Sequence, residues 1–161
     1  MDGIEPVILE RWILTDTYLS YILYGENIIP ATDNTEPLLY FSTNNGSSFV
    51  ASIDSGRQYI GMSSSGSGHE YQANAGYAQM ATDMGNDTNK GFCFRVDLIN
   101  LRDASDAKSF LFHTCGYHAA ERYTWVGGIH VPETSAINYV RFGMNNGNIT
   151  SGRIVLYGVE K

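Results

Sequence analysis

The stretch that decides the fold is GFCFRVDLINL, residues 91–101. Its apolar side chains fall on every second position, and charged residues stand between them. The apolar set is Phe92, Phe94, Val96 and Leu98, and the opposite set contains Arg95 and Asp97. Because successive side chains of a β-strand point to opposite faces, this period of two predicts a strand with one buried and one solvent-facing side.

The same period of two recurs on both sides of this stretch. We expect about nine strands, drawn from residues 7–14, 18–29, 38–43, 48–53, 57–62, 91–101, 109–114, 121–129, 137–144 and 153–159. Residues 71–81 are the only candidate for a short helix, and the pattern there does not favour one.

Asn and Gly mark the expected reversals, since both tolerate the positive φ of tight turns. Asn-Asn-Gly at 145–147 predicts a C-terminal hairpin between residues 137–144 and 153–159. A second Asn-Asn-Gly, at 44–46, predicts a hairpin between residues 38–43 and 48–53. We expect SSSGSG, residues 63–68, to form a loop tip, and residues 82–90 to form a longer polar loop.

Many short strands separated by Gly- and Asn-rich turns predict an all-β fold, an antiparallel β-sandwich or jelly roll. No linker or repeat divides the chain, so we expect one domain over residues 1–161. A short N-terminal segment, about residues 1–6, is a candidate for attachment to a partner.

Charge and hydropathy exclude several classes of function. Asp and Glu number 17 against 10 Lys and Arg, giving a net charge of −7, so no cationic stripe is available for nucleic acid. No apolar run approaches the roughly 20 residues of a membrane helix, and we expect no membrane insertion. The N-terminus MDGIEPVILERW is acidic where a signal peptide is basic, which predicts synthesis in a cytoplasm. In that reducing environment we expect Cys93 and Cys115 to be free, buried thiols.

Three segments together resemble one family of small β-sandwich domains. They are YILYGENIIPATDNTEPLLYFSTNNGSSFVAS (21–52), GFCFRVDLINLRDASDAKSFLF (91–112) and AINYVRFGMNNGNITSGRIVLYGV (136–159). The chain resembles domains of bacteriophage and prophage tail proteins and of other virion structural proteins.

The resemblance implies a virion protein, made in the host bacterial cytoplasm, that acts by packing and adhesion and has no catalytic residues. A head decoration, head-fibre or tail accessory subunit fits this description. The expected partners are other virion proteins and further copies of the chain, with a trimer as the favoured oligomer. The alternative is a receptor-binding, lectin-like module that contacts bacterial surface glycans.

The segment 18–29 supplies candidate oligomer contacts, because both faces of this expected strand are apolar. The candidates are Tyr18, Tyr21, Ile22, Leu23 and Tyr24. The alternative is a strand buried between two layers of one domain.

The candidate glycan contacts are aromatic and polar side chains close together in the sequence, as sugar recognition requires. They are Tyr117, His118, Tyr123, Trp125 and His130. Tyr123 and Trp125 are two residues apart, so they share one face of a strand, and packing in the core is the alternative role for them.

The cluster His113, Cys115, His118 and Glu121 is the most enzyme-like feature, since a Cys beside a His can form a nucleophile or a zinc site. No second Cys or His pair with ligand spacing accompanies it, so we expect no enzyme, no metal and no cofactor. Residues 83–89 and 103–106 carry oxygen ligands of the kind calcium uses, but turns in which Asp and Asn bind their own backbone explain both.

Overall fold

The computed structural model describes residues 11–61, 66–118 and 121–160. Every regular element in these ranges is a β-strand, and every strand pair is antiparallel. The strands are β1 (Arg11–Ile13), β2 (Ser20–Pro30), β3 (Pro37–Ser42), β4 (Ile53–Gly61), β5 (Ser67–Ala75), β6 (Ala78–Gln79), β7 (Phe92–Ile99), β8 (Lys108–His118), β9 (Glu121–Val131), β10 (Tyr139–Met144) and β11 (Ile149–Val159).

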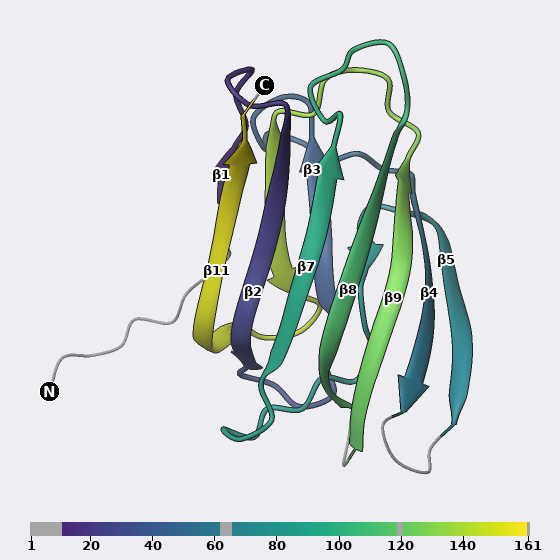
Figure 1. Cartoon of the computed structure of the whole chain (residues 1–161), viewed down its shortest axis with the longest axis vertical. Helices are drawn as coiled ribbons and strands as arrows, with labels where there is room; N and C mark the ends of the chain where they lie inside the picture. Colours follow the sequence, from purple (N-terminus) through teal and green to yellow (C-terminus); the bar gives the residue numbers. More distant parts are fainter. Residues whose placement is uncertain (1–10, 62–65, 119–120, 161) are drawn as a thin grey trace, which may run out of the picture.

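The strands form two sheets that pack face to face (Figure 1). One sheet has seven strands in the order β11-β2-β7-β8-β9-β4-β5, and the other has four in the order β1-β10-β3-β6. In Figure 1 the seven-stranded sheet faces the viewer, with β11 on the left and β5 on the right. The predicted β-sandwich is confirmed, with eleven described strands where about nine were expected.

The core lies between the sheets and is built by the alternation seen first in residues 91–101. Phe92, Phe94, Val96 and Leu98 are all buried on the inner face of β7. Phe94 stacks on Phe142 of β10 across the inter-sheet space, with ring centroids 4.6 Å apart. Aromatic pairs of this kind contribute roughly 0.5–1.5 kcal/mol beyond the apolar area they bury.

The predicted C-terminal hairpin is wrong, although its turn is present. Gly147 has a φ of 74°, as the Asn-Asn-Gly signal requires. However, β10 pairs with β1 on one side and β3 on the other, so neither edge is free for β11. The chain therefore crosses to the other sheet, where β11 pairs with β2.

The predicted hairpin between residues 38–43 and 48–53 is also wrong. Asn45 and Gly46 have the positive φ values of a tight reversal, 58° and 82°. The neighbours of β3 are β10 and β6, so residues 48–52 form no strand and lead to β4 in the other sheet. One backbone hydrogen bond, from Val50 N to Phe41 O at 2.9 Å, is what remains of the expected pairing.

Two strands appear where none was expected. β5 covers residues 71–75 of the segment 71–81 considered as a helix. It begins at Ser67, inside the expected loop tip 63–68, of which residues 63–65 lie outside the described residues. β6 is the two-residue partner of β3. Of the expected strand 7–14, β1 covers Arg11–Ile13, and the candidate attachment segment 1–6 lies outside the described residues.

Lys108 closes the end of the sandwich at which β8 begins. It is 1% exposed, and its ammonium donates hydrogen bonds to the backbone oxygens of Asp106, Glu133, Thr134 and Ser135 at 2.7–3.1 Å. Burial lowers the pKa of Lys108, and nearby carboxylates oppose the shift. One side chain thus joins the connection before β8 to the connection after β9.

The described residues form no helix long and apolar enough to cross a membrane.

Candidate functional site

The five candidate glycan contacts lie on or beside the β8–β9 hairpin, and the sheet divides them. Tyr123 and Trp125 point into the sandwich, where they are 9% and 1% exposed. His118 ends β8 on the same inner side. Tyr117 and His130 stand at strand positions between the inward-facing residues, so their side chains lie on the outward face. The five residues therefore do not form one surface, and the packing role describes Tyr123 and Trp125.

The three inward-facing residues line a small pocket at the end of the inter-sheet space opposite Lys108. Its volume is about 110 Å³. The lining comprises Tyr59, Glu70, Thr82, His118, Tyr123 and Trp125. The Tyr123 ring is central: its centroid lies 5.0 Å from that of His118, 5.6 Å from that of Trp125 and 5.9 Å from that of Tyr59.

A buried ion pair supports the β4–β5 side of the pocket. Arg57 and Glu70 are cross-strand partners, and the guanidinium forms an ion pair with the carboxylate. The Arg57 side chain is only 4% exposed, and its Nη1 also donates to Gln79 O at 3.3 Å. Burial raises the pKa of nearby Glu36, the charge of Arg57 opposes that shift, and the charge of Asp83 adds to it. Glu36 thus has one cation, Arg57, and two other carboxylates, Asp83 and Glu70, as its charged neighbours.

His118 is held by the connection that follows β6. Its Nε2 lies 3.0 Å from Asp83 Oδ2, and Asp83 adopts the left-handed conformation with a φ of 51°. Met84, the next residue, forms backbone bridges with both Thr35 and His118. The imidazole is therefore oriented by a carboxylate and half-exposed at the mouth of the pocket, where it can donate or accept a hydrogen bond.

Sequence reasoning missed Arg57, Tyr59, Glu70 and Thr82 as members of this site. The alternation of Ile53, Ser55, Arg57 and Tyr59 on one face of β4 is a signal that could have found the first two. Glu70 was missed because the alternating apolar residues of SGHEYQANA, such as Tyr71 and Ala73, are exposed, whereas the less exposed positions hold polar Glu70 and Gln72. Thr82 lies outside any strand, and no local pattern marks it.

The candidate oligomer contacts on β2 also divide between the two faces. Tyr21 and Leu23 are in the core, at 5% and 0% exposed. Ile22 and Tyr24 lie half-buried on the outward face, and Tyr18, before the strand, is exposed with its ring edge against Tyr21. The four-stranded sheet thus covers one apolar side of β2, and the other side remains on the surface.

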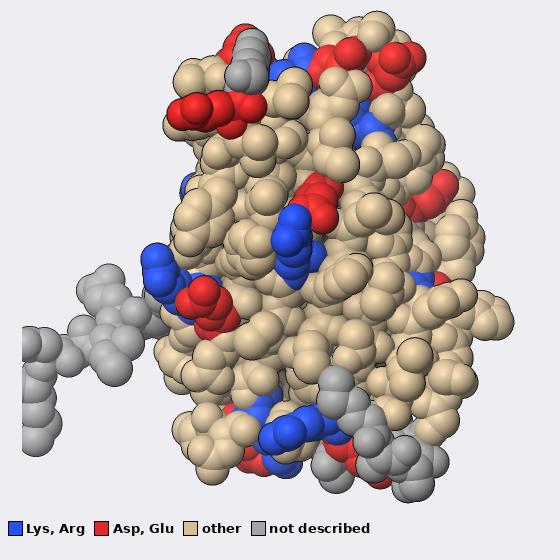
Figure 2. All heavy atoms as spheres, viewed as in Figure 1, with Lys and Arg blue, Asp and Glu red and all other residues tan. Residues whose placement is uncertain are grey.

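This outward face of the seven-stranded sheet is broad and carries few charges. Figure 2 views it directly and shows the charged side chains gathered mainly at its two ends, with few over its middle. The central charges are an ion pair, Arg95 to Asp97, at 2.8 Å. The most exposed apolar side chains on the face are Ile60, Tyr71, Ile99, Leu111, Val126 and Tyr157, each at least 47% exposed.

The expectation of buried thiols is wrong, because Cys93 and Cys115 are both free and exposed on this outward face. They occupy the outward positions of β7 and β8, between inward-facing Phe92, Phe94 and Thr114. His113 shares that face, whereas His118 faces the inner pocket. Within residues 11–61, 66–118 and 121–160, no three His, Cys, Asp or Glu side chains gather as ligands of one metal ion.

The acidic segment 103–106 folds as a turn stabilised by its own side chain. Asp103 Oδ1 accepts hydrogen bonds from the backbone nitrogens of Ser105 at 2.6 Å and Asp106 at 3.3 Å. These bonds, with that from the Ser105 hydroxyl, lower the pKa of Asp103 to about 2. The interpretation of this segment as an Asp-stabilised turn is confirmed.

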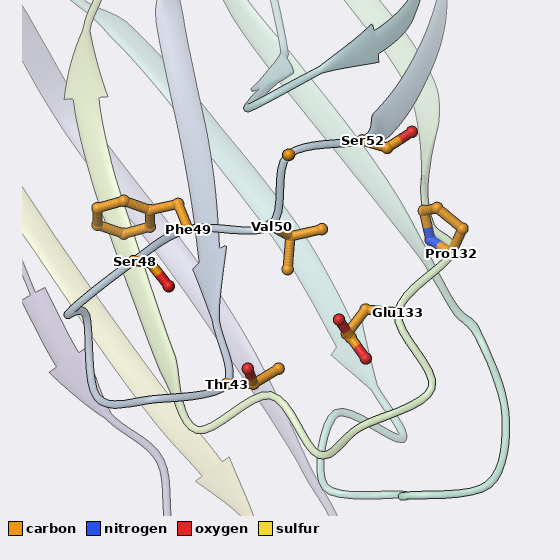
Figure 3. Close-up of a pocket in the computed structure, with 8 residues that line it drawn as sticks. Thr43, Ser48, Phe49, Val50, Ser52, Pro132 and Glu133 are labelled. Atoms are coloured by element: carbon orange, nitrogen blue, oxygen red, sulfur yellow. The ribbon is translucent and has the colours of Figure 1, made fainter.

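A wider hollow of about 370 Å³ lies between the connection 43–52 and the residues after β9 (Figure 3). Figure 3 shows Val50 and Glu133 facing each other across it. Glu133 Oε1 accepts a hydrogen bond from Ser135 N at 2.8 Å, and such bonds lower the pKa of Glu133. The carboxylate of Glu133 therefore stabilises the local turn, and we assign no ligand to this hollow.

Comparisons of the chain with protein-family models, with curated proteins and with solved structures find no match.

Proposed function

We propose that this protein is a structural subunit of a bacteriophage particle, in which it works by protein–protein packing without chemistry. The resemblance of residues 21–52, 91–112 and 136–159 to virion β-sandwich domains supports the virion assignment. The observation that carries the packing role is the outward face of the seven-stranded sheet, which carries six well-exposed apolar side chains and few charges over its middle.

The size of this face matches that of a specific interface. Seven strands about 4.8 Å apart and about ten residues long span roughly 29 by 33 Å. That is roughly 900 Å² of sheet, against about 800 Å² buried per partner in a standard interface.

The charge distribution allows a further copy of the chain to occupy this face. Two molecules that each carry a net charge of −7 repel one another. Contact through the outward face keeps most of that charge apart, because Arg95 neutralises Asp97 and Arg153 lies 4.0 Å from Glu26. The subunit is therefore a homo-oligomer that also packs on other virion proteins.

The oligomer is tested by placing charge on the face. Light scattering at tens of micromolar should find an oligomer for the original chain and a monomer for the double variant Leu111→Asp/Val126→Asp. Ile13→Asp is the matched control, since Ile13 is 69% exposed but belongs to the other sheet, and it should leave the oligomer intact. A monomeric original chain, or an oligomer unaffected by the double variant, contradicts the packing face. Detection of the chain in stoichiometric amounts in gradient-purified particles tests the virion assignment separately.

A second candidate function, binding of bacterial surface glycans, is favoured by the pocket at His118. Aromatic rings stand beside a carboxylate and an imidazole there, which is the combination that sugar sites use. At about 110 Å³ the pocket is smaller than the roughly 300–1,000 Å³ of a drug-sized ligand site. It suits one sugar substituent better than a whole ring.

Two histidines on the same strand provide the test of this second function. His118 lines the pocket and His113 lies on the outward face. If the pocket binds glycans, the original chain and His113→Ala should give saturable binding to bacterial polysaccharides, and His118→Ala should lose it. Trp125→Ala is unsuitable, because Trp125 is part of the core. Absence of binding by the folded original chain contradicts this function and leaves the structural one.

A further inference from the structure

The two cysteines of the chain are direct cross-strand partners. Cys93 of β7 pairs with Cys115 of β8, and the register continues without a shift through Phe94 with Thr114 and Arg95 with His113. Both thiols are free and exposed. Residues that are opposite in an antiparallel pair point to the same side of the sheet, so both sulfur atoms lie on the outward face.

The backbone spacing of this pair suits a disulfide whichever kind of position it occupies. Opposite residues in an antiparallel pair have Cα atoms about 4.5 Å apart at non-hydrogen-bonded positions and about 5.5 Å apart at hydrogen-bonded ones. Disulfides join Cα atoms about 4.4–6.8 Å apart. A covalent bond between Cys93 and Cys115 therefore requires rotation of the side chains and no change of register.

Reactants can reach the pair from solvent. Both cysteines line two adjoining hollows on the outward face, of about 390 and 320 Å³. The first hollow includes Arg95 and His113, and the second includes Arg122, whose Nε donates to Tyr117 Oη at 2.9 Å. These hollows leave room for a small disulfide compound beside either thiol.

We propose that Cys93 and Cys115 form a redox site that closes to an intramolecular disulfide by exchange with a low-molecular-weight disulfide of the glutathione type. One cysteine thiolate attacks a sulfur of the oxidised compound, its S–S bond breaks, and one thiolate leaves. The second cysteine thiolate then attacks the protein sulfur of the mixed disulfide and releases the other thiolate. Two protein thiols are oxidised, one disulfide compound is reduced to two thiols, and the two protons pass to the released thiols.

The bond would cross-link β7 to β8 and close a loop over residues 93–115. Such a cross-link stabilises the folded chain mainly by restricting the unfolded one. For a loop of this length and a chain of this size we expect Tm to rise by roughly 5–10 °C. The site is reduced in a cytoplasm and closes in an oxidising medium, so it adds stability once the protein has left the cell. The inference does not require the proposed function, but Cys93 and Cys115 lie on the outward face that this function would cover, so the exchange takes place in the free subunit.

The test uses intact mass under native conditions. The reduced full chain is incubated with oxidised glutathione, and alkylation then counts the remaining thiols. We expect each chain to have lost two hydrogens, to carry no glutathione, to have no covalent link to a second copy and to have the higher Tm. Cys93→Ser and Cys115→Ser are matched controls, and each should instead retain one glutathionyl group on its remaining cysteine.

Three results would overturn the proposal. They are two glutathionyl groups on the original chain, disulfide-linked dimers in place of the internal bond, and free thiols that persist while the single variants react. Circular dichroism before and after oxidation shows that the reaction occurred in the folded protein. Loss of the β-sheet signal on formation of the bond would also count against a site built into the native register.

Discussion

The two faces of the seven-stranded sheet have different tasks, and strand β8 shows the contrast within a few residues. Phe112 is 1% exposed and packs in the core, whereas Leu111, its neighbour in sequence, is 61% exposed on the outward face. Both are large apolar side chains, and only the direction in which each points differs. Stability therefore resides on the inner face, and the outward face is available for association and for the thiol pair.

Replacement of the adjacent residues Phe112 and Leu111 by Ala should give the largest difference in the free energy of unfolding between the two faces. Phe112→Ala removes a fully buried ring, and we expect the free energy of unfolding to fall by about 3–5 kcal/mol. Leu111→Ala removes an exposed side chain and should change it by less than about 0.5 kcal/mol. Urea denaturation at a protein concentration low enough to keep both variants monomeric measures the difference, and similar losses for the two would contradict the division of the sheet.

A substitution at Lys108 tests whether the loss of a buried charged side chain also destabilises the protein more than the loss of an exposed one. Lys108→Met keeps the apolar stem and leaves four backbone oxygens without their donor. We expect a loss of about 2–4 kcal/mol, less than for Phe112 because the buried charge itself is costly. Lys90→Met is the control, since the Lys90 side chain is 32% exposed and bonds a single surface carboxylate, Asp87. A Lys108 variant as stable as this control would contradict the closure described above.

Two Arg–carboxylate ion pairs lie on opposite faces of the seven-stranded sheet, so the contribution of the same interaction to stability can be compared between a buried and an exposed position. Glu70→Gln removes the partner of buried Arg57, and we expect a loss of about 1–2 kcal/mol, since Glu70 is itself one-third exposed. Asp97→Asn removes the partner of Arg95, which is 47% exposed, and should cost no more than about 0.5 kcal/mol. Chemical denaturation at low and high salt checks both, and a larger loss at Asp97 would reverse the comparison.

The sequence predicted the strands with strong alternation and missed those without it. Residues 91–101 became β7 with the expected inner face, and Gly46 and Gly147 adopted the expected positive φ. Turn residues show that the chain reverses, but they do not show which sheet the next strand joins. Both predicted hairpins failed for this reason, since β3 and β10 are occupied by partners distant in sequence.

The site was harder to predict than the fold, because its residues come from four separate segments. His118, Tyr123 and Trp125 were found because they are close in the sequence. Arg57 and Glu70 meet only through the pairing of β4 with β5, and Thr82 lies in a connection. The thiol pair depends in the same way on the register of β7 and β8, which no local pattern encodes.

The substitution Glu36→Gln should have the smallest effect on stability, and it should raise stability where the other substitutions lower it. Glu36 lies at the end of the inter-sheet space near Arg57. Burial raises its pKa, so the folded protein binds its proton more tightly than the unfolded chain does. As pH rises through the ordinary value of 4.5, the unfolded chain loses this proton first and stability falls, until the folded carboxyl is also ionised. At neutral pH the buried charge therefore lowers the stability of the folded protein, and Glu36→Gln, which keeps an acceptor for Asn145 Nδ2, should raise Tm slightly.

This gain in Tm should vanish below about pH 4, where the carboxyl is protonated in both the folded and the unfolded state. Glu26→Gln, at an exposed carboxylate, should give no such gain. A Glu36 variant less stable than the original chain at neutral pH would show that the attraction of its charge to Arg57 outweighs its burial.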